Sequence, residues 1–133
     1  MKVIKISIKT SQRNEFLDIT DRIIDSVYNS GVNSGMAVIY TPHTTAGITI
    51  NENADPSVRR DIAEFLSKKI PYHGDYKHLE GNADAHIKSS LIGCSETVII
   101  ENGKILLGTW QGIFFCEFAG PRRREVWIKI IES

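Results

Sequence analysis

Apolar and polar residues alternate over several short segments of this sequence. In the first, residues 4–9, three isoleucines are separated by lysine and serine. A period of two places every second side chain on the same face, so such a segment forms a strand with one buried face. Residues 46–51 alternate in the same way. Asn102-Gly103 lies between two further apolar segments and is typical of a two-residue β-hairpin. These segments predict a sheet of antiparallel neighbours.

Other segments carry helix signals. The first predicted helix has Thr20 as its N-cap and ends at Gly31. A second begins at Asp55-Pro56, because Asp is a favoured cap and Pro a favoured first residue. A third covers residues 83–92, and residues 71–82 before it form a long predicted loop. The second helix carries a predicted buried stripe, formed by Val58, Ile62, Phe65 and Leu66.

This order of segments predicts one α+β domain over residues 1–133, with a mainly antiparallel mixed sheet and helices packed on one face. A chain of 133 residues is long enough to bury a core of its own. Cys94 and Cys116 therefore do not indicate a disulfide scaffold. In the aromatic segment 110–118 the predicted core face consists of Trp110, Phe114, Cys116 and Phe118, and the opposite face carries Gln111 and Glu117.

The charge balance limits the classes of partner. Lys plus Arg and Asp plus Glu each number 16, so the formal net charge is zero. This argues against a nucleic-acid binder that relies on bulk phosphate contacts, although a small anion site is still compatible with it. No apolar run approaches the roughly 20 residues of a membrane span. The alternation from residue 4 also interrupts any secretion signal, and we expect a cytoplasmic protein without a membrane partner.

The first polar stretch begins at Thr41 and contains His43. It follows a continuously apolar predicted strand, and a residue at the end of a rigid element is often functional. A turn in which threonines satisfy backbone groups explains the stretch equally simply. The next strand ends in residues 51–56, where Asp55 is explained as a helix cap. Glu52 and its neighbouring asparagines exceed what a turn requires.

The second polar stretch carries His78 and His86, with Glu80 and Asp84 between them. Imidazole and carboxylate ligands suit zinc, and an open fourth position would make such a site catalytic. The spacing matches no standard zinc motif. The alternative is a hydrated loop followed by a capping Asp84.

Two groups of residues suggest anion binding. Lys88 and Ser89 follow a predicted helix start, and a helix N-terminus with lysine and serine nearby can hold phosphate. The arginines at 122–124 could add a second contact, since guanidinium groups bind phosphate bidentately. A solvated, edge-protecting set of arginines is the alternative.

Four separated motifs together resemble the YjbQ-like family, whose members are often labelled secondary thiamine-phosphate synthases. They are HTTAGITINENADPSV at 43–58, HLEGNADAHIKSS at 78–90, GTWQGI at 108–113 and GPRRR at 120–124. The resemblance implies a mixed α+β sheet structure and a homotrimer. It also implies that three histidines, His43, His78 and His86, converge on one pocket that binds a divalent metal such as zinc.

The resulting hypothesis is a small cytosolic metal-binding enzyme that acts on a phosphorylated small molecule, with the thiamine-phosphate synthase reaction implied by the resemblance. The candidate catalytic residues are Glu52, Asp84 and Gln111. The candidate phosphate-binding residues are Lys88, Ser89, Arg122 and Arg124. One alternative is metal-assisted hydrolysis of a phosphorylated metabolite. The other is a non-catalytic module that binds a metabolite or a metal.

Overall fold

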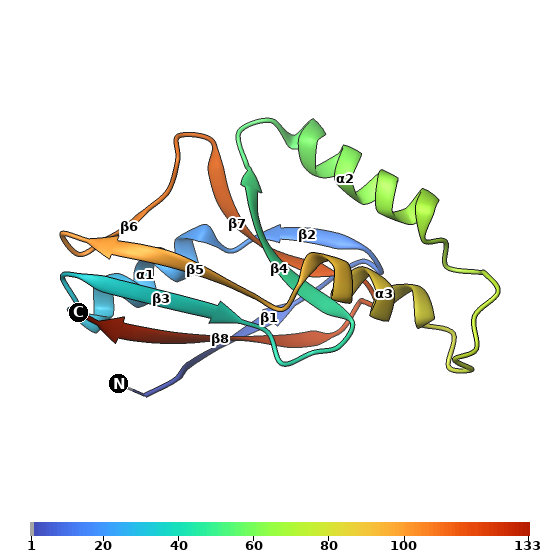
Figure 1. The fold of residues 1–133 in the computed structure, drawn as a ribbon, viewed down its shortest axis with the longest axis horizontal. Coiled ribbons are helices and arrows are strands. Elements are labelled where there is room, and N and C mark those ends of the chain that lie inside the picture. The colour runs from blue at the N-terminus through green and yellow to red at the C-terminus, as the bar shows by residue number, and fades with distance from the viewer. Residues whose placement is uncertain (1) are drawn as a thin grey trace.

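The computed structural model describes residues 2–133. Over these residues the chain forms eight strands and three helices (Figure 1). In chain order they are β1 (Ile4–Lys9), β2 (Glu15–Asp18), α1 (Thr20–Ser30), β3 (Gly35–Tyr40), β4 (Ala46–Glu52), α2 (Pro56–Lys69), α3 (Ala83–Ile92), β5 (Ser95–Glu101), β6 (Lys104–Leu106), β7 (Gln111–Glu117) and β8 (Arg123–Glu132). The predicted α+β class is confirmed.

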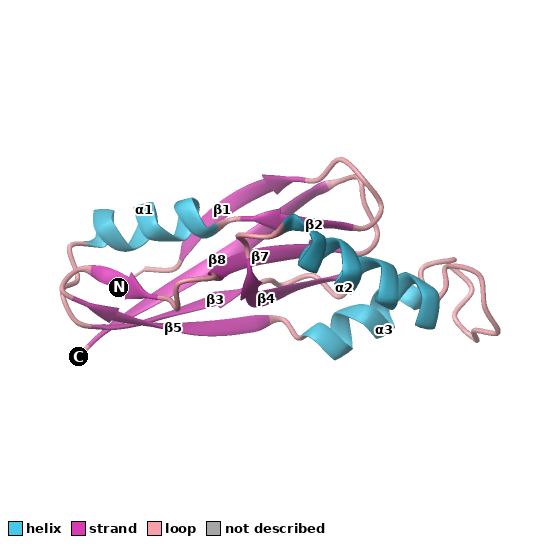
Figure 2. Ribbon diagram, turned by 90° about the horizontal axis from the view of Figure 1, so that it is seen from above, coloured by secondary structure: helices cyan, strands magenta, loops and turns pink. Residues whose placement is uncertain are grey.

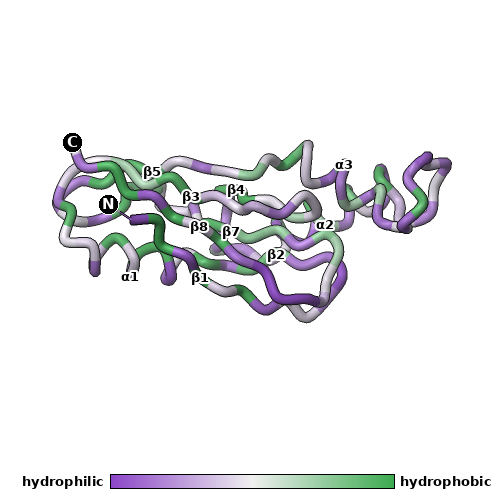
Figure 3. Tube along the Cα trace, turned by 90° about the horizontal axis from the view of Figure 1, so that it is seen from below, coloured by the Kyte–Doolittle hydropathy of each residue, from purple (hydrophilic) through white to green (hydrophobic). Residues whose placement is uncertain are grey.

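The strands form two antiparallel sheets. The larger has the order β1-β8-β3-β5-β6, and the smaller has the order β2-β7-β4. The apolar strand β3 lies in the middle of the larger sheet, as its composition predicts. The Asn102-Gly103 turn joins β5 to β6, and both of its residues have a positive φ, which matches a type I′ hairpin turn. Apolar and polar residues alternate along β1 (Figure 3).

The main core lies between the two sheets and against α1. Alternation sends Ile8 of β1 and Ile128 of β8 into this core, where both are almost fully buried. Burying an apolar side chain of this size contributes about 1.5–3 kcal/mol. Ile23 of α1 joins the same cluster. Thr20 is the first residue of α1 and not its cap, because its hydroxyl accepts a hydrogen bond from the Ile113 N–H at 2.9 Å.

Strand β7 is buried on both faces. Ile113 and Phe115 point into the main core, and Phe114, Cys116 and Phe118 pack in a second cluster with α3. Helices α2 and α3 lie together at the end of the molecule opposite α1 (Figure 2). The prediction that Trp110 belongs to the core is wrong, because Trp110 precedes β7 and is 63% exposed.

Helix α2 begins as the sequence predicts but packs differently. The Asp55 carboxylate accepts a hydrogen bond from the Ser57 N–H at 2.9 Å, and Pro56 is the first helical residue. No residue of α2 is fully buried: the predicted stripe is half-buried except for Phe65, which is 60% exposed and does not belong to it. One side chain of α2, that of Leu66, packs against the second cluster. The loop after α2 projects beyond the body of the protein (Figure 1). Within the described residues, none of the helices has the length and apolar character needed to span a membrane.

Candidate functional site

The side chain of His43 pairs with the backbone of β8 beyond the point where β3 ends. Strand β3 ends at Tyr40, opposite Trp127, whereas β8 continues back to Arg123. Beyond that point the backbone of Glu125 has no strand partner on the β3 side. The Nε2 atom of His43 accepts a hydrogen bond from the Glu125 N–H at 2.9 Å. The Thr41 hydroxyl donates to the Glu125 carbonyl at 3.2 Å. Two side chains therefore satisfy the peptide groups that a strand would otherwise pair with.

This hydrogen bond defines the state of the imidazole. An Nε2 atom that accepts from an N–H carries no proton, so the neutral ring is protonated at Nδ1. Burial lowers the pKa of His43 below its usual value, and the positive charge of Arg124 lowers it further. Nearby carboxylates oppose the shift without reversing it. His43 is therefore held as a neutral ring, and its Nδ1–H has no hydrogen-bond acceptor among residues 2–133.

A cavity of about 470 Å³ lies between residues 40–44 and α3. We call it the histidine pocket, because its walls carry both His43 and His86. The hydroxyl of Ser89 donates to the Ala46 carbonyl at 2.6 Å, and the hydroxyl of Ser90 donates to the His86 carbonyl at 2.9 Å. Both serine protons are thus used within the protein. The polar side chains of the lining that make no such bond with residues 2–133 are those of His86, Tyr40, Thr44 and Cys94.

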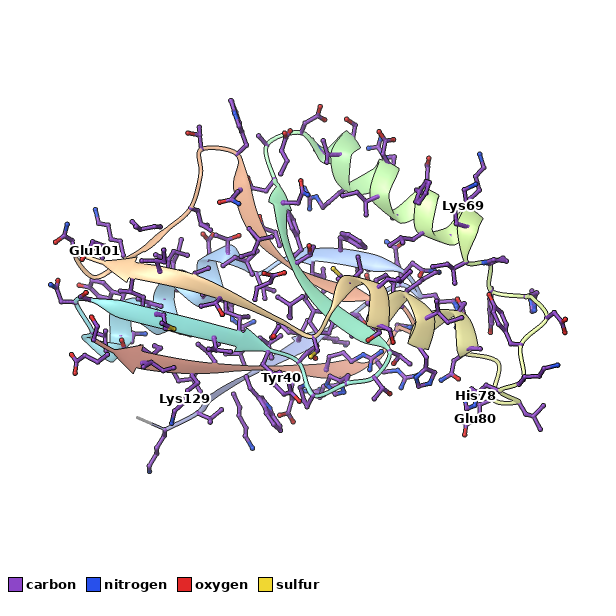
Figure 4. The ribbon with its side chains drawn as sticks, in the orientation of Figure 1. Tyr40, Lys69, His78, Glu80, Glu101 and Lys129 are labelled. Atoms are coloured by element: carbon purple, nitrogen blue, oxygen red, sulfur yellow. The ribbon has the colours of Figure 1, made fainter. Side chains whose placement is uncertain are left out.

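His86 also borders a second cavity, of about 340 Å³, which His78 lines from the loop before α3. The two ring centroids lie 5.3 Å apart with the planes at 82°. The Nε2 atom of His78 is 3.9 Å from a carboxylate oxygen of Glu80. Figure 4 shows His78 and Glu80 close together in this loop and Tyr40 at the end of β3. His86 therefore stands between His43 and His78.

The three histidines differ in whether they could bind a metal ion. Within residues 2–133, no group of three His, Cys, Asp or Glu side chains is placed to hold a metal ion. His43 does not fit as a ligand in this arrangement, since one ring nitrogen accepts from an amide and the other carries a proton. His78 and His86 fit as a pair of imidazole ligands. The structure thus places His86 beside His78 and in the wall of the same cavity as His43, and it does not bring these three histidines into one group.

Asp84 and Lys88 form an ion pair in the interior. Asp84 is fully buried and accepts from Arg13 Nη2 at 2.9 Å and from Lys88 Nζ at 3.4 Å. Lys88 also donates to Asn14 Oδ1 at 3.2 Å. Burial lowers the pKa of Lys88, and the Asp84 charge counteracts this. Helix α3 starts at Ala83, so Lys88 and Ser89 lie past its N-terminal turn, where no helix N–H groups are free for phosphate.

The side chain of Arg124 is also buried and paired within the protein. Its guanidinium forms a bidentate pair with Glu117 and donates from Nη2 to Thr45 Oγ1 at 2.8 Å. Burial would raise the pKa of Glu117, but hydrogen bonds from Arg124 and Thr10 outweigh it and the pKa is lowered. Arg122 donates from Nε to the Ala119 carbonyl at 2.9 Å.

Glu117 is absent from the predicted set of site residues, although its partner Arg124 lines a cavity that His43 also borders. A glutamate within the otherwise apolar β7, together with an arginine at the start of the next strand, is the signal that could have identified the pair.

Glu52 and Gln111 lie at the other end of the small sheet. In the β4–β7 pairing Glu52 is opposite Gln111, and Ala46 is opposite Glu117. The length of β4 separates these ends by roughly 20 Å at about 3.3 Å per residue. His43 precedes the Ala46 end, so the structure does not bring Glu52 or Gln111 to it.

Both side chains make local turn contacts instead. Glu52 accepts from the Asp55 N–H at 3.2 Å. Gln111 accepts from the Gly108 N–H at 2.8 Å. The polar groups at the end of β4 are thus explained by the turn that leads from β4 into α2, and Gln111 is explained by the turn that precedes β7.

Comparison with known proteins places this chain in a family. The family described as UPF0047 protein YjbQ-like matches residues 4–133. The UPF0047 protein MJ1081 of Methanocaldococcus jannaschii is 66% identical over 127 residues, covering 96% of this chain and 92% of that protein. The UPF0047 protein YugU of Bacillus subtilis is 51% identical, covering 95% and 96%.

Solved structures agree with the sequence comparison. An uncharacterized conserved protein of the YjbQ/UPF0047 family from Clostridium acetobutylicum has a TM-score of 0.94 at 62% identity, covering 96% of this chain and 99% of that one. A protein of unknown function from Sulfolobus solfataricus has a TM-score of 0.94 at 30% identity, covering 99% and 97%. From the match over residues 4–133 and these relatives, the chain belongs to the YjbQ/UPF0047 family.

Proposed function

We propose that this protein is a small enzyme that binds a phosphorylated small molecule in the histidine pocket. The observation that carries the proposal is His43, whose neutral ring is anchored at Nε2 by the Glu125 N–H. Its Nδ1–H can donate to an oxygen on which negative charge develops. A fixed neutral donor needs no reorganisation during a reaction, and such preorganised donors are a major source of catalysis.

We propose that a divalent metal, zinc in the first instance, is bound by His78 and His86. Their ring centroids are 5.3 Å apart, and phosphate oxygens of the ligand would supply further coordination. A metal bound there would neutralise phosphate charge and act as a Lewis acid. The structure supports two histidine ligands for it better than three.

The reaction that the family resemblance implies joins a pyrimidine diphosphate to a thiazole phosphate and releases pyrophosphate. It depends on neutralising anionic charge more than on a nucleophilic side chain. The test is to incubate purified protein, zinc and both substrates and to measure thiamine phosphate. We expect product with the wild-type protein and loss of product in His43→Gln and His86→Ala. His73→Gln, in the exposed loop, is the matched control.

The same samples test the hydrolase version, through phosphate release from phosphorylated metabolites. Absence of any turnover by the wild-type protein with metal present would remove the enzyme proposal. One observation favours a binding module instead: Ser89, Ser90 and Lys88 all donate their side-chain protons within the protein. That version predicts saturable ligand binding with no product formed.

We also propose that the protein assembles as a homotrimer through the outer face of the larger sheet. On that face four apolar side chains lie in register across neighbouring strands: Leu106, Ile99, Met36 and Ile131. More than two-fifths of the surface of each residue is exposed, and for Ile99 the exposed fraction is 59%. A continuous exposed apolar row of this kind is typical of a protein interface. Light scattering should give a trimer, and Ile99→Lys should dissociate it. A monomeric wild-type protein would exclude this assembly.

A further inference from the structure

A second cavity also borders His43. It has a volume of about 360 Å³ and is lined by β1, β8 and His43. We call it the basic cleft, because its charged lining includes Lys5, Arg123 and Arg124 and only one carboxylate, that of Glu125. Arg124 is already neutralised by Glu117. The cations left for a ligand are therefore Lys5 and Arg123.

Arg123 is unpaired within the part of the chain that the structure describes. Its guanidinium makes no hydrogen bond or ion pair with any residue from 2 to 133. Across the β1–β8 ladder it faces Lys9, a second exposed cation. Like charges directly opposite each other destabilise a strand pair. The chain thus concentrates positive charge at this end of the sheet without neutralising it.

The single carboxylate of the cleft is occupied elsewhere. Glu125 Oε1 accepts from the Trp127 ring N–H at 2.7 Å, which holds it along β8. The Lys5 ammonium lies 4.7 Å from the centroid of the Trp127 ring. Neither contact gives Arg123 a counter-charge. An anion that entered the cleft would meet a free guanidinium and a nearby ammonium against one engaged carboxylate.

We propose that the basic cleft binds the phosphate or pyrophosphate group of the ligand, with Arg123 and Lys5 as its main contacts. Guanidinium groups bind phosphate oxygens bidentately, and an ammonium adds a point charge. The proposal rests on the proposed function, because His43 forms a wall of both cavities. A ligand held at Arg123 would then place its non-phosphate part beside the Nδ1–H of His43. The sequence predicts that Arg122 and Arg124 contact the anion. We assign this contact to Arg123 instead.

Calorimetric titration with inorganic pyrophosphate, and separately with orthophosphate, tests the cleft directly. Arg123→Gln and Lys5→Gln should each weaken binding about tenfold, as expected for loss of one charge-assisted contact. Glu125→Gln should strengthen binding, because it removes the only negative charge in the lining. Lys104→Gln, an exposed lysine on the far edge strand β6, is the matched control and should bind like the wild type.

An independent readout comes from NMR titration of His43. Pyrophosphate in the cleft should raise the pKa of His43, because a neighbouring anion favours the protonated ring. The rise should be absent in Arg123→Gln.

Pyrophosphate binding that is undetectable in the wild type, or unchanged in both Arg123→Gln and Lys5→Gln, would overturn the proposal. That result leaves product formation in the histidine pocket untouched, since His86→Ala tests it separately. Loss of product in His86→Ala with normal pyrophosphate binding would show that His86 acts in the histidine pocket while the anion is held in the basic cleft.

Discussion

The imidazole of His43 accepts a hydrogen bond at Nε2 from the backbone N–H of Glu125, with 2.9 Å between the two nitrogens. This contact makes one side chain part of both the sheet and the pocket. It completes the pairing of β8 where β3 has ended, and it leaves the ring neutral with a proton on Nδ1. The same ring therefore stabilises the sheet and lines the pocket. We expect both the stability of the protein and the properties of the pocket to depend on pH.

The pKa of His43, lowered from the usual 6.5, predicts a loss of stability in mild acid. Below pH 6.5 the unfolded chain takes up a proton that the folded chain does not, so the free energy of unfolding falls as pH falls toward the folded pKa. His43→Gln keeps an acceptor for the Glu125 N–H but cannot titrate. Urea unfolding at several pH values should show a smaller slope for this variant, with His73→Gln as control. Equal slopes for His43→Gln and wild type would contradict the assignment.

Glu117→Gln should destabilise the protein by about 3–5 kcal/mol, because it leaves the buried guanidinium of Arg124 without its counter-charge. The double variant Glu117→Met, Arg124→Met removes both charges and should recover much of the loss. Chemical denaturation measures all three proteins, and Glu101→Gln at the exposed hairpin provides a control. A double variant no more stable than Glu117→Gln would show that the pair contributes more than mutual neutralisation.

The two partners of Asp84 predict an asymmetry between substitutions. Asp84→Asn removes the counter-charge of both Lys88 and Arg13, whereas Lys88→Met leaves Asp84 paired with Arg13. Unpaired buried charges are costly, so Asp84→Asn should lower the free energy of unfolding more than Lys88→Met does. Guanidinium denaturation of both variants provides the comparison. The opposite order would mean that Arg13 does not neutralise Asp84.

Zinc binding should depend on His78 and His86 but not on His43. The centroids of the first two rings lie 5.3 Å apart in an edge-to-face arrangement, whereas both nitrogens of His43 are engaged or protonated. Equilibrium dialysis followed by elemental analysis should show loss of bound zinc in His78→Ala and His86→Ala, and wild-type stoichiometry in His43→Gln. Loss of zinc in His43→Gln would restore the three-histidine site.

Two phenylalanines on neighbouring elements should differ sharply in their contribution to stability. Phe114→Ala should cost about 3–5 kcal/mol, because the ring is 1% exposed in the second cluster. Phe65→Ser on α2 should change the free energy of unfolding by no more than about 0.5 kcal/mol, since that ring is 60% exposed. Thermal and urea unfolding measure both. A large loss for Phe65→Ser would show that α2 is covered in the assembled protein.

Features that depend on near neighbours in the chain could be predicted from the sequence. Alternation identified β1 and β4, the Asn102-Gly103 dipeptide identified the β5–β6 hairpin, and Asp55-Pro56 identified the start of α2. Each of these follows from backbone geometry or capping within a few residues. The structure places His43 and His86 in the walls of one cavity and His78 in the wall of a neighbouring one, so the convergence of all three on one pocket stays a prediction.

Features that depend on contacts between distant segments were decided only by the tertiary structure. Alternation cannot show that β7 is buried on both faces, because that requires a second layer formed by α3. The register of β4 against β7 separates Glu52 from His43, and the twofold period of β8 turns Arg124 inward while Arg123 faces solvent. The sequence by itself therefore determined the elements and the candidate polar groups. Packing of the two sheets, a long-range effect, decided which of those groups are buried in ion pairs and which still face a ligand.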